Sequence, residues 1–144
     1  MNQWESVGFS GSREGLTQFQ LALLGLIIRR QKIAKVHHGD CVGADAMFHN
    51  LVKELGIWVI IHPPINPRNK AHGIANDYRK PLPYLDRNKE IVKESTILLA
   101  CPKDESEDTR SGTWQTIRYA RKLGRPTLVI FPSGEIILSG GTNV

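Results

Sequence analysis

The sequence predicts an α/β fold, a three-layer sandwich in which about five parallel strands lie between helices on both faces. Segments with the apolar spacing of helices alternate along the chain with short apolar runs of strand length. Thirteen glycines and eight prolines in 144 residues favour short elements separated by turns. The run 58–62 is apolar almost throughout, which is typical of a strand covered on both faces.

The first half of the chain is expected to contain three strands and two helices. Phe19, Leu23, Leu26 and Ile27 recur at helical spacing, and the second helix ends at Gly56, a residue suited to the left-handed conformation after a helix. In chain order the expected elements are strand 6–9, helix 16–30, strand 35–38, helix 44–55 and strand 58–62.

The second half opens with a proline-rich segment, 63–83, which is long for a loop in a compact domain. Its composition suits a lid that orders when ligand binds and closes a pocket. The elements expected after it are helix 84–94, strand 96–101, an acidic loop 102–108, a helix from 111 or 112 to 123, strand 127–131 and a short edge strand at 135–138.

Alternation of this kind implies right-handed crossovers and a parallel, Rossmann-like sheet. Ligands of such sheets bind beyond the carboxyl ends of the strands, near the switch in strand order. Polar, glycine-containing loops follow the strands at 6–9, 35–38 and 96–101. We therefore expect these three loops to meet at one edge of the sheet.

Composition and charge limit the classes of function. Residues 1–144 have the length of one domain, and the net charge of +5 suits an anionic ligand without a dense basic run. Cys41 and Cys101 are too few for a disulfide scaffold and are expected to be reduced. With neither a membrane-spanning apolar run nor a secretory signal visible, the expected location is the cytoplasm.

The loop after the first strand has the composition of a phosphate-binding turn. Small residues let the backbone approach an anion, hydroxyls donate to it, and the following helix offers unpaired N–H groups. Arg13 adds a charged donor. The alternative is a tight turn with an exposed arginine. The candidate nucleotide-binding residues here are Ser10, Gly11, Ser12 and Arg13.

The other two loops also precede helices. Asp45 has two open roles: it stabilises the first helical turn, or it accepts hydrogen bonds from a ribose or base. Trp114 either stacks on a base or packs in the core. The candidate binding residues are Gly39, Asp40, Gly43 and Asp45 in one loop and Ser111, Gly112 and Thr113 in the other.

Metal and cofactor chemistry is not indicated. The histidines show no metal-ligand spacing, and the adjacent His37 and His38 point to opposite faces of a strand. No nucleophile elbow or catalytic triad is present either. The sequence thus predicts no metal site and no resident cofactor.

Together these motifs resemble the SLOG superfamily, a Rossmann-like group that includes the LOG phosphoribohydrolases, the DNA-processing protein A family and small YspA/YpsA-like proteins. The YspA-like branch is the most similar. The resemblance covers residues 7–131 and rests on Ser10-Gly11-Ser12-Arg13, His38-Gly39-Asp40 with Gly43-Ala44-Asp45, Arg87-Asn88 and Ser111-Gly112-Thr113.

This resemblance implies site residues and limits the activity. Arg87 matches a catalytic arginine of the LOG enzymes, and Asn88 beside it is expected near the sugar or base. Thr116 stands where those enzymes have a glutamate, and a hydroxyl is a poor substitute for a carboxylate at an oxocarbenium-like centre. N-glycosidic hydrolysis is therefore expected to be slow or absent, with Asp45 as the replacement carboxylate.

The prediction is a nucleotide-binding protein, either a sensor or a nucleotide-processing enzyme, that forms a homo-oligomer as its superfamily implies. The alternative is a single-stranded nucleic-acid binder of the DNA-processing type. That alternative uses the charge of +5 and the basic residues Arg68, Lys70, Arg79 and Lys80.

Overall fold

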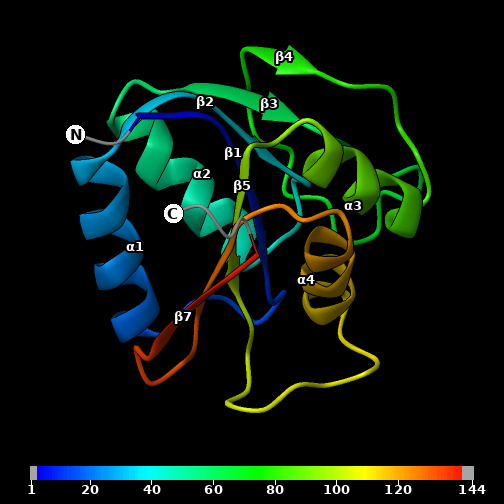
Figure 1. Cartoon of the computed structure of the whole chain (residues 1–144). Coiled ribbons are helices and arrows are strands. Elements are labelled where there is room, and N and C mark those ends of the chain that lie inside the picture. Colours follow the sequence, from blue (N-terminus) through cyan, green and yellow to red (C-terminus); the bar gives the residue numbers. More distant parts are fainter. Residues whose placement is uncertain (1–2, 141–144) are drawn as a thin grey trace.

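The computed structural model describes residues 3–140 and shows a seven-stranded sheet between two pairs of helices (Figure 1). The strands are β1 (Gln3–Gly11), β2 (Lys32–His38), β3 (Trp58–Ile61), β4 (Asp77–Tyr78), β5 (Ile97–Cys101), β6 (Thr127–Ile130) and β7 (Ile136–Ser139). The helices are α1 (Gln18–Arg30), α2 (Ala44–Glu54), α3 (Tyr84–Lys93) and α4 (Gly112–Lys122). Within the described residues no helix is long and apolar enough to cross a bilayer.

The strand order is β4-β3-β2-β1-β5-β6-β7, and every neighbouring pair is parallel except β6 and β7. The predicted α/β fold with a parallel, Rossmann-like sheet is confirmed. The short edge strand expected at 135–138 is β7, and it pairs antiparallel with β6. Strand β4 lies inside the segment that was expected to be loop. The chain moves outward from β1 to β4 and then returns to the other side of β1, so the switch in strand order lies between β1 and β5.

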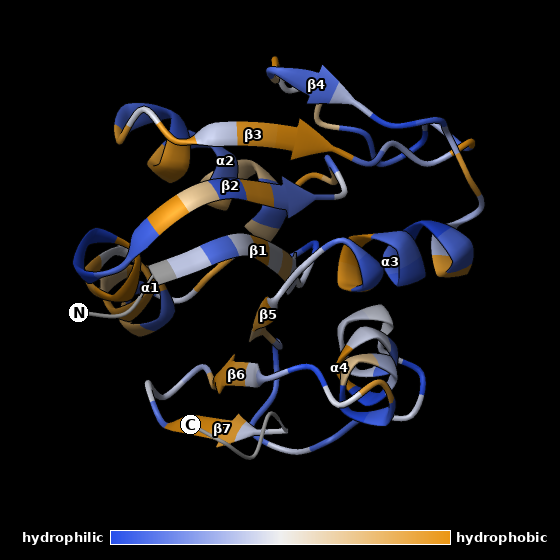
Figure 2. Cartoon of the chain, turned by 45° about the horizontal axis from the view of Figure 1, so that its top comes forward, coloured by the Kyte–Doolittle hydropathy of each residue, from blue (hydrophilic) through white to orange (hydrophobic). Residues whose placement is uncertain are grey.

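Each face of the sheet has its own core. On β5, Leu99 packs with α1 and α2, whereas Leu98 and Ala100 pack with α3 and α4. A strand that is buried on both faces needs apolar residues at every position, which explains its uninterrupted sequence. Figure 2 shows that β3, which lies inside the sheet, is mostly apolar, whereas β4 at the sheet edge is hydrophilic.

Strand β1 is longer than expected, because backbone pairing extends it in both directions. Gln3 is in register with Lys32 of β2, and Gly11 is in register with Cys101 of β5. These hydrogen bonds join backbone groups and do not depend on the side chains. The polar residues at the start of β1 therefore gave no strand pattern in the sequence.

Candidate functional site

A cavity of about 510 Å³ lies where β1 and β5 end, next to the switch in strand order. This volume is within the usual range for small-molecule sites. All predicted site residues line it except Asp40 and Gly43. The lining residues that were predicted are Ser10, Gly11, Ser12, Arg13, Gly39, Asp45, Arg87, Asn88, Ser111, Gly112 and Thr113.

The turn after β1 is held close to the start of α2. The carbonyl of Ser12 accepts hydrogen bonds from the N–H groups of Gly15 and Ala44, at 3.1 and 2.9 Å. A Cβ atom at Gly11 would lie 2.5 Å from the Cβ of Ala44, so only glycine allows this approach. The turn therefore presents its backbone to the cavity in a fixed position, with the exposed side chain of Arg13 beside it.

The first turn of α4 forms another part of the cavity wall. Ser111 caps the helix, because its hydroxyl accepts from the N–H of Trp114 at 3.2 Å. The N–H groups of Gly112 and Thr113 have no acceptor among residues 3–140. A Cβ at Gly112 would meet nothing within 4 Å. Gly112 and Thr113 both line the cavity, so two N–H donors without a protein acceptor lie at its wall, at the positive end of a helix dipole. Such an arrangement favours an anion such as phosphate.

Arg87 is a buried cation in the cavity wall. Its Nη1 donates to the carbonyls of Gly39 and His62 at 2.6 and 3.0 Å, and its Nε donates to Asn88 Oδ1 at 2.7 Å. A Cβ at Gly39 would lie 2.5 Å from the guanidinium carbon, so the glycine makes room for it. None of the ion pairs within residues 3–140 includes Arg87. Its acceptors are therefore neutral, and an anionic ligand would supply the missing counter-charge.

Asp45 is the buried carboxyl of the site. Its Oδ2 accepts from the N–H of Cys41 at 3.1 Å. Burial raises the pKa of Asp45 to about 6, against the opposing effect of the positive charge of Arg87. Burial also raises the pKa of the neighbouring Cys41 thiol, so that thiol is protonated at neutral pH. At pH 6 to 7 Asp45 is poised to accept or donate a proton.

Several lining residues were not predicted. Cys41 and Tyr84 line the cavity beside Arg87, and Lys103, Asp108 and Arg110 come from the connection between β5 and α4. Lys103 is paired with Glu14, another lining residue, at 3.2 Å. Lys103 could have been predicted as a lining residue from its position, two residues after the end of β5, at the sheet edge where ligands were expected.

Asp40 and Gly43 lie outside the cavity lining and have structural roles. Asp40 Oδ1 accepts from the N–H of Gly73 at 2.8 Å, and its carbonyl accepts from the N–H of Ala71 at 2.7 Å. Gly43 has a φ of 88°, and a Cβ there would lie 2.2 Å from the carbonyl oxygen of Arg13. Asp40 thus holds segment 63–83 in place, and Gly43 allows the turn after β1 to pack against α2.

Burial and position settle the open alternative for Trp114 and add to the account of Thr116 and of segment 63–83. Trp114 is a core residue, with its ring 6.1 Å from that of Phe131, and it does not line the cavity. Thr116 is also buried, and its hydroxyl donates to the carbonyl of Gly112 at 2.9 Å. No residue of 63–83 lines the cavity, and backbone bonds such as Ile65 N–H to the Leu82 carbonyl already pin this segment. The structure does not place it as a lid.

No protein-family model matches the sequence. No curated protein matches it either.

Solved structures with a similar fold do exist. The molybdenum cofactor binding protein from the phototrophic bacterium Rippkaea orientalis has a TM-score of 0.67 and 20% identity, over 88% of this chain and 76% of that chain. DNA processing protein A from Helicobacter pylori, solved to describe its single-stranded DNA binding mode, has a TM-score of 0.61 and 18% identity, over 87% of this chain and 64% of that chain. A structural genomics target has a TM-score of 0.61 and 16% identity, over 85% of this chain and 72% of that chain. Similarity at these identities shows a common fold, and a common fold does not by itself imply a common function.

Proposed function

We propose that the chain binds a phosphate-bearing nucleotide or nucleotide derivative in the cavity between β1 and α4. One observation carries the proposal: two free N–H groups of α4 face the same cavity as the glycine turn of β1 and the unpaired guanidinium of Arg87. Three independent features that favour an anion meet within about 510 Å³.

The lining residues divide between the two parts of such a ligand. The phosphate lies against Gly112 and Thr113, with Arg13 across from them. The sugar or base lies toward Asp45 and Asn88, the polar side chains around Arg87. This division follows charge, because the helix dipole of α4 and the cation of Arg13 both attract a phosphate, whereas the carboxyl of Asp45 would repel it.

Binding is tested by a panel of mono-, di- and cyclic nucleotides, with the matching nucleosides as controls. At least one nucleotide raises the melting temperature, because a ligand that binds only the folded state stabilises it. Arg13→Ala weakens that ligand by about 1.5 to 3 kcal/mol, the range for hydrogen bonds to a charged group. Arg68→Ala is the matched control, since Arg68 is an exposed cation outside the cavity. Equal affinity in wild type and Arg13→Ala would remove the β1 turn from the site.

The SLOG resemblance and its YspA-like branch belong to this proposal. We infer a single nucleotide-binding domain over 1–144, located in the cytoplasm, where the buried thiols of Cys41 and Cys101 stay reduced. We also infer a homo-oligomer. Phe19 and Leu26 of α1 are exposed apolar residues that a second copy would cover. Sedimentation of the purified chain distinguishes an oligomer from a monomer.

A catalytic role would centre on Asp45. It is the only carboxyl among residues 3–140 that is both buried and in the cavity lining, and its raised pKa suits proton transfer. Thr116 cannot take part from its buried position. We expect the wild type to release little or no free base from nucleoside monophosphates, as measured by chromatography. Brisk release that survives Asp45→Asn would contradict this assignment of the carboxyl.

Single-stranded nucleic acid is the second candidate ligand, favoured by the fold shared with DNA processing protein A. The basic residues of segment 63–83 offer fewer free positive charges for a nucleic acid than the sequence indicated. Arg79 is already paired with Asp77 and Glu94, which leaves Arg68 and Lys80 exposed. Nucleic-acid affinity that falls steeply with salt and is lost in Arg68→Ala would favour this candidate over the mononucleotide.

A further inference from the structure

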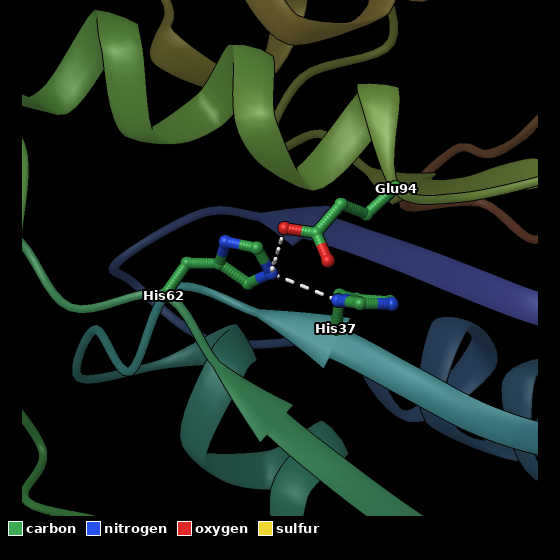
Figure 3. A group of neighbouring side chains, drawn as sticks. All are labelled: His37, His62 and Glu94. Carbon is green, nitrogen blue, oxygen red and sulfur yellow. Dashed lines mark hydrogen bonds and ion pairs between the residues drawn. The ribbon is translucent and has the colours of Figure 1, made fainter. Parts of the chain in front are cut away.

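Three side chains from separate elements meet on the α3 side of the sheet, apart from the cavity lining (Figure 3). His37 lies on β2, His62 follows β3, and Glu94 is the C-terminal cap of α3. His37 Nδ1 lies 2.8 Å from His62 Nε2, and His62 Nε2 lies 4.0 Å from Glu94 Oε2. Both imidazoles are buried, whereas 30% of the Glu94 side chain is exposed.

The hydrogen-bond network assigns the proton positions in this cluster. The hydroxyl of Ser6 donates to the carbonyl of Glu94 at 2.7 Å, so it has no second proton to donate. His37 Nε2, 2.8 Å from the same hydroxyl, must therefore carry a hydrogen and donate it. The lone pair of His37 is then on Nδ1, directed at His62. A histidine whose distal N–H is held by a hydrogen-bonded acceptor is in the form that binds metal ions.

Both rings are neutral at physiological pH. Burial lowers the pKa of His37 to about 4, although the charge of Glu94 opposes this effect. Burial and the neighbouring His37 likewise lower the pKa of His62. Neutral imidazole is the metal-binding form, so neither ring has to lose a net proton; His62 only has to change tautomer so that its lone pair is on Nε2.

We propose that His37 Nδ1, His62 Nε2 and Glu94 Oε2 form a binding site for a divalent transition-metal ion of the zinc class. Two imidazoles and a carboxylate are a common ligand set for Zn²⁺, with water in the fourth position. Zn–N bonds of about 2.0 to 2.1 Å in a tetrahedron separate the ligand atoms by about 3.3 Å. Two of the present spacings, 2.8 and 4.0 Å, reach that value by shifts of less than about 1 Å, and all three ligand atoms already lie within 4.8 Å of one another. His62 moves its proton from Nε2 to Nδ1 as the ion binds.

The charges around the cluster permit a cation. Arg79 orients the carboxylate of Glu94 through both oxygens: Nη2 donates to Oε1 at 2.7 Å, and Nε donates to Oε1 and Oε2 at 3.0 and 3.1 Å. Oε2 is the oxygen that lies toward His62, and metal binding there would replace its contact with Arg79 Nε. The positive charge of Arg79 is offset by its second partner, Asp77. The carboxyl end of α3, where Glu94 lies, adds the negative end of a helix dipole. The exposed part of Glu94 gives an ion and its water ligand a route from solvent.

Titration of the whole chain with Co²⁺, followed by its visible absorption, tests the site, with Zn²⁺ as competitor. We expect one equivalent to bind with the intense bands of a tetrahedral site and to be displaced by Zn²⁺. Glu94→Gln keeps the shape of the side chain and should weaken binding more than tenfold, since loss of even an outer-shell partner costs 10- to 100-fold. His62→Gln should abolish the tetrahedral bands.

The chain offers a matched control in its other buried histidine pair. His38 Nε2 lies 2.9 Å from His49 Nδ1, outside the cluster. His49→Gln should therefore bind Co²⁺ as the wild type does. The proposal is overturned if Co²⁺ and Zn²⁺ do not bind at millimolar concentration, if Glu94→Gln binds equally well, or if His49→Gln alone loses the metal. Because Glu94 is partly exposed, its variant tests the site even if His62→Gln does not fold. The result is independent of nucleotide binding.

Discussion

Two buried charged residues determine the chemistry of the cavity. Arg87 donates only to neutral acceptors, and Asp45 is held where burial raises its pKa to about 6. Both arrangements cost stability, because a buried charge without an ion pair is unfavourable. Such costs are typical of functional sites, where the missing partner is a ligand.

The cost at Asp45 has a defined pH dependence. The folded chain holds the Asp45 proton more tightly than the unfolded chain, whose carboxyl has the ordinary pKa of 3.8. The folded state therefore loses stability as pH rises from about 4 to 6, and above pH 6 the loss is up to about 3 kcal/mol. Asp45→Asn cannot ionise, yet its amide oxygen can still accept from the N–H of Cys41.

We therefore expect Asp45→Asn to have a free energy of unfolding about 1 to 3 kcal/mol above that of the wild type at pH 8. The difference should shrink toward zero near pH 4. Urea unfolding of both proteins at several pH values measures it. A difference that is constant with pH, or a variant less stable than wild type at pH 8, would show that Asp45 is not held as a high-pKa carboxyl.

Among the elements, α4 carries the clearest prediction. Gly112 is the first residue of the helix, and a side chain there meets no protein atom within 4 Å. An aspartate at this position stabilises the first helical turn by about 0.3 to 1 kcal/mol but repels a bound phosphate. Gly112→Asp should thus be as stable as the wild type or more so, and should bind the nucleotide more than tenfold less tightly.

Gly112→Asn is the control for this prediction, because asparagine has the same shape without the charge. Calorimetric titration of both variants separates the two effects. The Asn variant should bind more tightly than the Asp variant. If the aspartate leaves affinity unchanged, the phosphate does not lie at the start of α4.

The sequence predicted the four helices within one or two residues, since amphipathic spacing and terminal glycines are local signals. It did not predict β4, a strand of two residues whose pairing with β3 depends on the backbone rather than on side-chain pattern. The same strand bears on the interpretation of segment 63–83. Prolines and charged residues suggested a lid, but backbone hydrogen bonds hold the segment along the sheet edge.

In the whole molecule, topology decided which predictions succeeded. Loops after parallel strands must meet at one sheet edge, so the part of the cavity lining that these loops supply followed from strand order, whereas Arg87 and Asn88 followed from the SLOG resemblance. The His37, His62 and Glu94 cluster had no such signal. Its members are far apart in the sequence, and they meet because β2 and β3 are neighbours and α3 ends beside β1. Contacts of this kind depend on packing that no local pattern records.

The most direct test of the central claim is a titration of the ¹⁵N-labelled chain with a nucleoside monophosphate that binds, followed by amide chemical shifts. The account predicts the largest changes at Gly112, Thr113 and the turn from Gly11 to Arg13, and little change there with the matching nucleoside. Saturable changes confined to Arg68, Lys80 and their neighbours, or equal changes with nucleoside and nucleotide, would contradict a phosphate site between β1 and α4.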